Sequence, residues 1–216
     1  MFAKAVLFDL DGTLTDSGAG IINCAIYAME RLGVPVPPRE EMDVFVGPPL
    51  WDTFRRFGVP DSRVDEAVDI FRSRYVPIGK FENTPYPGIR EVLEALRSQG
   101  RKLYVATSKP EVTAREILAH FDLAGFFTEI CGATEDKTRS SKEDVIAYLL
   151  SLDPCQGTCV MVGDTAFDVL GAAAHQIPTI GAAWGYGKVE DMVSAGAAAI
   201  AQSPEELLRI ITEEAF

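Results

Sequence analysis

The feature that most constrains this chain is an apolar run, residues 5–8, that ends in two aspartates one residue apart, Asp9 and Asp11. A short apolar run followed by turn residues such as Gly12 is typical of a strand buried in a parallel sheet. Ligands of open α/β sheets bind at the carboxyl ends of the strands. The run therefore predicts that Asp9 and Asp11 lie at the functional edge of an α/β protein.

The spacing of the two aspartates indicates a shared site. Residues i and i+2 of a strand point to the same face, so both carboxylates can meet there. Two neighbouring carboxylates repel each other unless a cation lies between them, and Mg²⁺ prefers carboxylate and phosphate oxygens. A turn or capping role is the commoner explanation of such a pair. The pair alone leaves both interpretations open.

Strand-like and helix-like segments alternate after residue 84. We expect strands at 103–106, 126–131, 159–162 and 179–183, and a short one at 198–201. Helix-like segments lie between them, and residues 203–206 form a capping box that opens the last helix. This alternation predicts an α/β fold, a Rossmann-like doubly wound parallel sheet covered by helices on both faces.

Residues 16–84 follow a different pattern. They show helical periodicity interrupted by prolines at 34–38 and 47–49, and they contain no convincing strand. Because this block follows the first strand, it predicts an all-helical cap domain inserted beside Asp9 and Asp11. We therefore expect a core domain of residues 1–15 and 85–216 and a cap domain of residues 16–84.

Charge and cysteine content narrow the possible partners and compartment. The net charge of −12 disfavours nucleic acids and anionic membranes as partners. No signal-peptide pattern and no apolar run of the ~20 residues that span a bilayer are found. The four cysteines lack zinc-site spacing and are expected to be reduced (Cys24, Cys131, Cys155 and Cys159). We expect a cytoplasmic monomer or homodimer.

The full run of residues 9–17, Asp-Leu-Asp-Gly-Thr-Leu-Thr-Asp-Ser, resembles the first motif of the haloacid dehalogenase-like (HAD) hydrolase superfamily in its phosphatase form. The resemblance implies that Asp9 is the nucleophile that takes the phosphoryl group and that Asp11 is the general acid/base. Dehalogenases of the superfamily lack the second aspartate, so Asp11 favours phosphoryl chemistry. The helical insertion resembles the C1-type cap of this family.

A strand end and a helix start match the family's second and third motifs. Thr107 corresponds to the Ser/Thr of motif two, and the resemblance implies that Thr107 and Ser108 bind the phosphate. The family also has a lysine that offsets the charge of the nucleophile and the phosphoryl group. Lys142, in the first turn of a predicted helix, fits this position better than Lys109 or Lys137.

Residues 163–168, Gly-Asp-Thr-Ala-Phe-Asp, match the family's fourth motif. The resemblance implies that Asp164 ligates Mg²⁺ and that Asp168 orients metal waters or holds Lys142. With Asp9 and the backbone carbonyl of Asp11, these residues form a predicted magnesium site of mostly oxygen ligands. The following aromatic turn, residues 184–187, either lines the site or packs on the edge of the sheet.

The cap offers weaker indications of substrate. Residues 45–50 resemble the substrate loop of phosphoglycolate phosphatase-like members, and residues 138–146 resemble a bacterial branch described as 5′-nucleotidases. Gly47 and Arg55 are the candidate substrate contacts in the cap, although an arginine on a helix is usually solvated. The expected partner is a small phosphorylated metabolite.

The function expected from these motifs is Mg²⁺-dependent hydrolysis of phosphoglycolate or nucleoside 5′-monophosphates through an aspartyl-phosphate. Two alternatives remain open. One is a phosphomutase of the β-phosphoglucomutase kind, and the other is a non-catalytic binding protein with the HAD fold.

Overall fold

The computed structural model describes residues 3–134, 136, 138–153 and 159–213. The chain divides into two compact units, one of residues 1–15 and 85–216 and the other of residues 16–84. We call them the core and the cap and describe each by itself. None of the helices in the described ranges combines the length and the hydropathy that crossing a membrane would require.

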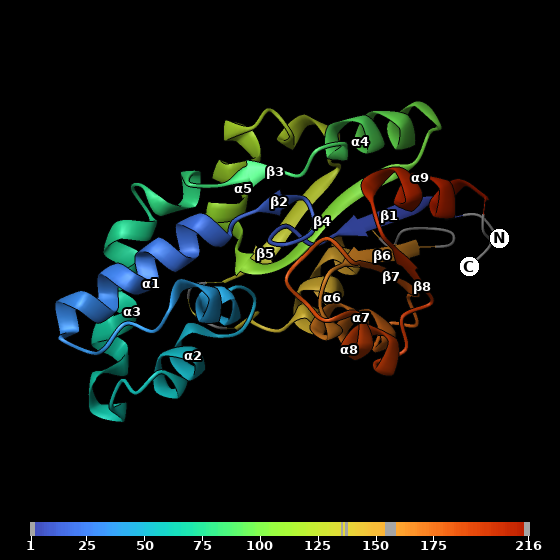
Figure 1. Ribbon diagram of the computed structural model, residues 1–216. Helices are drawn as coiled ribbons and strands as arrows, with labels where there is room; N and C mark the ends of the chain where they lie inside the picture. The colour runs from blue at the N-terminus through green and yellow to red at the C-terminus, as the bar shows by residue number, and fades with distance from the viewer. Residues whose placement is uncertain (1–2, 135, 137, 154–158, 214–216) are drawn as a thin grey trace. The chain divides into compact units, whose positions relative to one another are not determined.

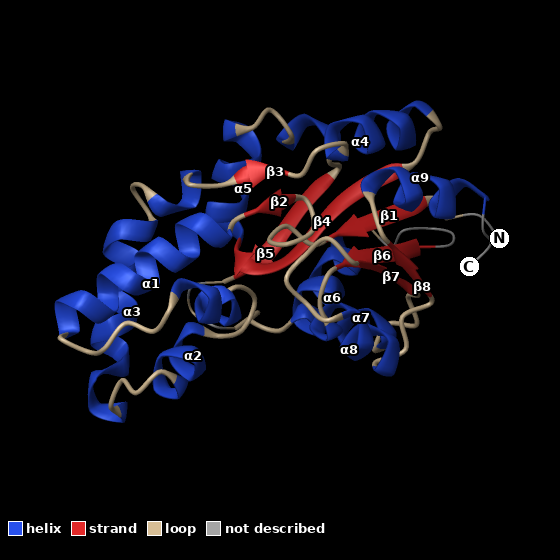
Figure 2. Ribbon diagram, in the orientation of Figure 1, coloured by secondary structure: helices blue, strands red, loops and turns tan. Residues whose placement is uncertain are grey.

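The core is built on a six-stranded sheet with the strand order β5-β4-β1-β6-β7-β8, shown in red in Figure 2. Neighbouring strands run parallel, and β1 lies between β4 and β6, where Phe8 pairs with Val105 and Val162. The strands are β1 (Ala5–Phe8), β4 (Lys102–Pro110), β5 (Glu129–Ala133), β6 (Cys159–Gly163), β7 (Thr179–Ala182) and β8 (Ala199–Ala201). The predicted parallel α/β fold is confirmed.

Alternation along β1 explains why both faces of the sheet are covered. Val6 and Phe8 face one apolar cluster, with α4 (Ile89–Ser98), α5 (Glu111–His120) and α9 (Pro204–Glu213). Ala5 and Leu7 face the other cluster, with α6 (Lys142–Leu152) and α7 (Ala166–Ala173). In Figure 1, α4 and α9 lie above the strands, and α6, α7 and α8 (Val189–Ser194) lie below them. All four β1 side chains are buried, as expected of a central parallel strand.

Two strand boundaries differ from the predictions. The strand expected at 126–131 is β5 at Glu129–Ala133, because Ala124–Phe126 forms a 3₁₀ turn, η4. Phe127 packs edge-on against Phe8 with ring centroids 6.3 Å apart, so its apolar character reflects core packing and not strand pairing. β4 continues to Pro110, beyond the predicted end at residue 106.

The cap is helical, with two short strands at its ends. Its helical segments are α1 (Gly18–Leu32), η1 (Arg39–Phe45), α2 (Leu50–Arg56), η2 (Asp61–Arg63), α3 (Val64–Tyr75) and η3 (Gly79–Phe81). The two connecting segments, β2 (Thr15–Asp16) and β3 (Thr84–Pro85), pair with each other. The expectation that residues 16–84 contain no strand is therefore wrong at both ends of that range.

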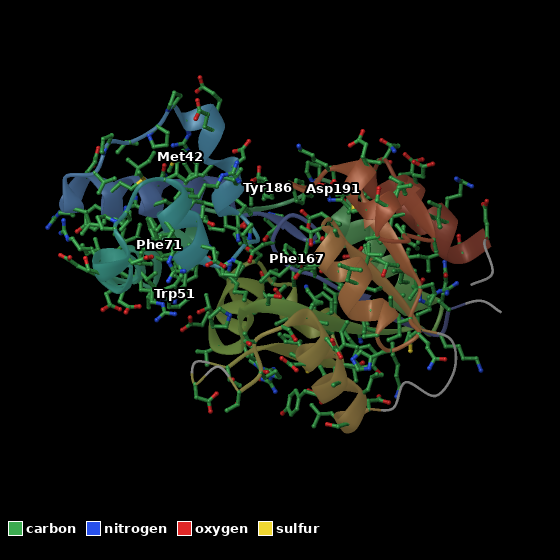
Figure 3. All side chains as sticks on the ribbon, turned by 90° about the horizontal axis from the view of Figure 1, so that it is seen from below. Met42, Trp51, Phe71, Phe167, Tyr186 and Asp191 are labelled. Atoms are coloured by element: carbon green, nitrogen blue, oxygen red, sulfur yellow. The ribbon has the colours of Figure 1, made fainter. Side chains whose placement is uncertain are left out.

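An aromatic cluster forms the interior of the cap. Phe45 packs against Phe54 and Phe57 at centroid distances of 5.2 Å, and Phe54 packs edge-on against Phe71. Met42 and Phe71, both labelled in Figure 3, are buried. This cluster gives the cap its own apolar core, consistent with a separately packed insertion.

Candidate active site

Asp9 follows the last residue of β1, and one of its two carboxylate oxygens makes the contacts that orient the side chain. Oδ1 accepts a hydrogen bond from the Leu10 N–H at 2.7 Å and lies 2.9 Å from Nζ of Lys142. None of the described residues donates a hydrogen bond to Oδ2. The side chain is 12% exposed. Asp9 therefore combines a fixed orientation with one oxygen that is available to a ligand or a reacting atom.

Lys142 begins α6, directly after the capping box of Ser141 and Asp144. Its Nζ lies 2.9 Å from Asp9 Oδ1, 2.7 Å from Asp168 Oδ1 and 2.9 Å from the Ala106 carbonyl oxygen. The ammonium thus donates a hydrogen bond to the Ala106 carbonyl oxygen and forms ion pairs with Asp9 and Asp168. Burial acts to lower the pKa of Lys142, but attraction to Asp168 and Asp9 outweighs it and raises the pKa above the usual lysine range. Lys142 is a fixed positive charge.

Asp168 is fully buried and uses both of its carboxylate oxygens. Oδ2 accepts hydrogen bonds from the Thr165 N–H at 3.0 Å and the Thr165 hydroxyl at 2.8 Å, which caps α7. Oδ1 contacts Lys142. Of the two roles that the sequence left open, the geometry favours holding Lys142.

Asp164 follows β6 and is enclosed by backbone. Its Oδ1 accepts a hydrogen bond from the Thr13 hydroxyl at 3.1 Å, and its Oδ2 accepts one from the Tyr186 N–H at 2.9 Å. A Cβ atom on Gly12 would lie 2.2 Å from Oδ2, and one on Gly185 would lie 2.3 Å from the Asp164 Cβ. Gly12 also has a φ of +81°, which favours glycine. The absence of side chains at these glycines lets the chain close around the carboxylate.

Asp9, Asp164 and Asp168 form a compact acidic cluster, in which one carboxylate oxygen from each lies within 4.8 Å of the others. Burial raises the pKa of Asp9 to about 6; repulsion by Asp168 adds to this effect, and Lys142 opposes it. Burial, with repulsion from Asp168 and Asp9, raises the pKa of Asp164 to about 8. Three buried carboxylates beside one lysine leave an excess of negative charge. An all-oxygen donor set of this charge fits a hard divalent cation such as Mg²⁺.

Asp11 lies outside this acidic cluster and pairs with a different lysine. Nζ of Lys109 lies 2.8 Å from Oδ1 and 2.6 Å from Oδ2 of Asp11, and the lysine side chain is only 6% exposed. The sequence indicated Lys109 only as a possible partner for the nucleophile. Its position two residues beyond Thr107 on β4 was the available indication that it reaches the same edge of the sheet.

The other predicted site residues divide between the core and the cap. Thr107 is buried and its hydroxyl oxygen accepts a hydrogen bond from the Lys109 N–H at 3.2 Å, whereas Ser108 is exposed. In the cap, Gly47 is exposed, and Arg55 pairs with Asp52 and Asp61 of its own unit. Lys137 lies outside the described residues. Substrate binding by these residues stays a prediction.

The aromatic turn after β7 both packs and contacts the site. Trp184 donates a hydrogen bond through Nε1 to the Thr13 carbonyl oxygen at 3.1 Å and packs edge-on against Tyr86. The backbone N–H of Tyr186, labelled in Figure 3, reaches Asp164. The sequence did not predict this contact, and the glycines on either side of Tyr186 were its only indication.

Comparison with known proteins identifies the family. A family model described as haloacid dehalogenase-like hydrolase matches residues 6–182. The chain belongs to the haloacid dehalogenase-like hydrolase family. The match spans Asp9, Thr107, Lys142 and Asp164, the residues on which the resemblance to this family was first based.

Relatives of this hydrolase carry several different names. A tyrosine-protein kinase PtkA from Mycobacterium tuberculosis is 45% identical over 87% of this chain, and a 5′-nucleotidase from Pseudomonas aeruginosa is 42% identical over 87% of this chain and 86% of its own length. A phosphoglycolate phosphatase from Aquifex aeolicus is 30% identical over 88% of this chain and 89% of its own length. The chain spans 64% of the length of the PtkA relatives.

Solved structures extend the similarity over nearly the whole chain. A structure of a predicted phosphatase from Clostridium acetobutylicum superposes with a TM-score of 0.91 and 38% identity, covering 99% of this chain and 100% of the other. The fold of the HAD hydrolases and the predicted branch, with relatives named phosphoglycolate phosphatase and 5′-nucleotidase, are confirmed.

Proposed function

We propose that this protein is a Mg²⁺-dependent phosphatase that hydrolyses small phosphomonoesters through an aspartyl-phosphate on Asp9. The observation that carries the proposal is the state of the Asp9 side chain. One of its oxygens is fixed by the Leu10 N–H and Lys142, and the other accepts no hydrogen bond from the described residues. A nucleophile needs this combination of orientation and an unengaged oxygen.

In the proposed first half-reaction, Asp9 Oδ2 attacks the phosphorus atom and the bond from phosphorus to the ester oxygen breaks. Asp11, in its protonated form, donates its proton to the leaving oxygen. In the second half-reaction, Asp11 takes a proton from water while the water oxygen attacks the same phosphorus. The acyl-phosphate bond then breaks, which releases phosphate and restores the Asp9 carboxylate.

The contacts described above support the following proposed roles for the two lysines. Lys142 stays charged beside Asp9 and offsets the negative charge of the phosphoryl group. Lys109 contacts both carboxylate oxygens of Asp11 and would hold the proposed general acid/base in position. Asp9 and Asp164 would hold the metal ion, which supplies charge neutralisation at the phosphoryl oxygens when bound. Thr107 would bind phosphate oxygens through its hydroxyl.

The substrate is proposed at the level of chemical class. Relatives named 5′-nucleotidase and phosphoglycolate phosphatase support a small metabolite with one phosphate group. The decisive measurement is phosphate release with Mg²⁺ from phosphoglycolate, nucleoside 5′-monophosphates, sugar phosphates and an aryl phosphate. Release from at least one of them supports the proposal. Exchange between sugar phosphates without net release would instead support a phosphomutase.

The substitution Asp9→Asn tests the nucleophile. We expect a loss of turnover on the order of 10⁶-fold, the scale seen when a catalytic nucleophile is removed. Asp191→Asn, at an exposed aspartate of α8 labelled in Figure 3, is the matched control and should retain full activity. Retained turnover in a folded Asp9→Asn protein would refute the assignment of Asp9.

A second candidate is transfer of a phosphoryl group from ATP to protein tyrosine, favoured by the 45% identity to relatives named tyrosine-protein kinase. The two functions differ in the fate of the phosphoryl group. Incubation with γ-labelled ATP and a tyrosine-containing protein distinguishes them, because a kinase places the label on tyrosine. A phosphatase leaves tyrosine unlabelled, because it releases inorganic phosphate from its own substrates.

A further inference from the structure

A second feature of the core lies at the other end of β4 from the candidate active site. A cavity of about 320 Å³ is lined by the end of α4, the start of β4 and the segment 125–128. Lys102, the first residue of β4, borders this cavity, whereas Thr107 lies toward the carboxyl end of the same strand. Five strand residues at about 3.3 Å each place the two roughly 17 Å apart. The cavity is therefore separate from the acidic cluster.

Two arginines of this cavity have no acidic partner. Arg97 donates through Nη1 to the carbonyl oxygen of Gly125. Arg101 donates to the Ala3 carbonyl oxygen and to the side chain of Gln99. Among the described residues, no carboxylate lies within ion-pair distance of either guanidinium. Their neutral acceptors satisfy N–H groups but leave both positive charges uncompensated.

A third arginine extends this positive surface along α4. Arg90 and Arg97, seven residues apart and so on one face of the helix, contact the Phe126 ring at 5.6 and 6.0 Å from its centroid. Arg90 donates to the carbonyl oxygens of Phe121 and Asp122. It likewise forms no ion pair in the part of the chain that the structure describes. Two guanidiniums thus contact one aromatic ring, and neither forms an ion pair among the described residues.

Arg90, Arg97 and Arg101 differ from the arginines that form ion pairs among the described residues. The chain has 32 acidic residues and 20 basic ones, so acidic partners are plentiful. Most arginines that the structure records in ion pairs lie elsewhere in the core or in the cap (Arg55, Arg63, Arg74, Arg115, Arg139 and Arg209). Burial lowers the pKa of Arg101. A partly buried cation without a counter-charge is unfavourable, and an anion beside it would remove that cost.

We propose that this cavity binds a phosphate group, as inorganic phosphate or as part of a small organic phosphate. Arginine presents N–H donors in a planar fork that matches phosphate oxygens, and Arg97 and Arg101 enter the cavity from adjacent elements. The volume is at the lower end of the range for small-molecule sites, which suits a phosphate with a small substituent. The net charge of −12 disfavours a nucleic acid as the source of the phosphate.

Side-chain NMR of the full chain tests this site directly. The Nε–Hε resonances of Arg97 and Arg101 are followed at low salt during titration with inorganic phosphate, then with AMP, with adenosine as the uncharged comparison. We expect saturable shifts with phosphate and AMP and none with adenosine. Tighter binding of AMP would identify an organic phosphate as the ligand, and equal binding would identify the free anion. Both results support the proposed phosphate site.

Variants separate this site from the active site. Arg97→Gln and Arg101→Gln should each weaken phosphate binding about tenfold, which is the effect of losing a charge-assisted hydrogen bond. In each variant the binding is followed at the resonance of the arginine that remains. Arg209→Gln, on α9, removes the same charge elsewhere and should leave binding unchanged. Neither cavity variant should alter kcat/KM, so the result does not depend on the proposed phosphatase activity.

Two outcomes would overturn the proposal. One is the absence of any shift at Arg97 and Arg101 in a protein whose resonances near Asp9 respond to phosphate. The other is an equal response to chloride, which would indicate non-specific screening of the arginines and no phosphate site. Arg97→Lys, which keeps the charge and loses the planar fork, should bind with intermediate affinity if the site recognises phosphate geometry.

Discussion

Replacing Lys142 by methionine tests the electrostatic account of the candidate active site. The substitution keeps the side-chain length but removes the ammonium, its ion pairs with Asp9 and Asp168 and its hydrogen bond to the Ala106 carbonyl oxygen. The lysine side chain is 4% exposed, so solvent does not replace the lost charge. Breaking a buried ion pair by removing one partner costs about 3–5 kcal/mol. We expect a loss of unfolding free energy in this range without metal at pH 8.

The cost of Lys142→Met should fall at lower pH. Burial already raises the pKa of Asp9 to about 6, and Lys142 opposes that rise, so its removal raises the pKa further. An acid with a raised folded-state pKa stabilises the fold below its unfolded pKa of 3.8 and loses that contribution as the pH rises through the folded value. The free energy of unfolding of the variant should therefore be closest to that of the parent protein near pH 4–5 and furthest below it near pH 8.

Urea unfolding followed by circular dichroism, at pH 5 and pH 8 with EDTA, measures both effects. Lys188→Met, at an exposed lysine, is the control and should change the free energy of unfolding by less than about 0.5 kcal/mol. Adding Asp168→Asn to Lys142→Met removes one of the two carboxylates that have lost their lysine partner. The free energy of unfolding lost in the double variant should therefore be smaller than the sum of the two single losses, by at least about 1 kcal/mol. A cost below about 1 kcal/mol at pH 8, or strict additivity, would refute the reasoning.

Two further predictions concern Asp11 and the metal ion. Lys109→Met should leave the fold intact and lower kcat about 10²-fold, because Asp11 loses the contact that orients it; unchanged phosphate release would contradict this role. Mg²⁺ should raise the thermal unfolding midpoint more at pH 8 than at pH 5, since ligands with pKa values raised to about 6 and about 8 must lose protons to bind it. Equal shifts at both pH values would argue against a site at Asp9 and Asp164.

The sequence predicted the fold well where local pattern and tertiary role agree. The continuous apolar run at 5–8 is β1, and the alternation after residue 84 is the parallel sheet. The strand prediction failed where apolar residues pack in the core without forming strand pairs in the sheet. Phe126 and Phe127 have strong strand character, yet Phe126 ends a 3₁₀ turn and Phe127 packs against Phe8. Such packing partners are distant in sequence, so no local pattern contains them.

The candidate site was predictable in its residues but not in its pairings. The motifs indicated Asp9, Lys142 and Asp164, and the structure brings these three together. The partner of Asp11 was not predicted, because assigning Lys109 to it requires the register of β4 against β1. A sequence motif does not indicate which oxygen of a carboxylate accepts a hydrogen bond or forms an ion pair. Those details depend on packing across strands that are far apart in the chain.

The central position of β1 has a consequence for the order in which this protein folds during synthesis. β1 is made before the other described strands of its sheet, and Ala5 pairs with Lys102 on one side and with Cys159 on the other. At synthesis rates of about 5–20 residues per second, the second partner follows roughly 8–30 s after the first strand. Until β4 is made, roughly 5–20 s after β1, this fully apolar segment has no sheet to join. Binding by a chaperone in this window would protect the nascent chain, and Asp9 meets Lys142 and Asp164 only after residue 164 has been synthesised.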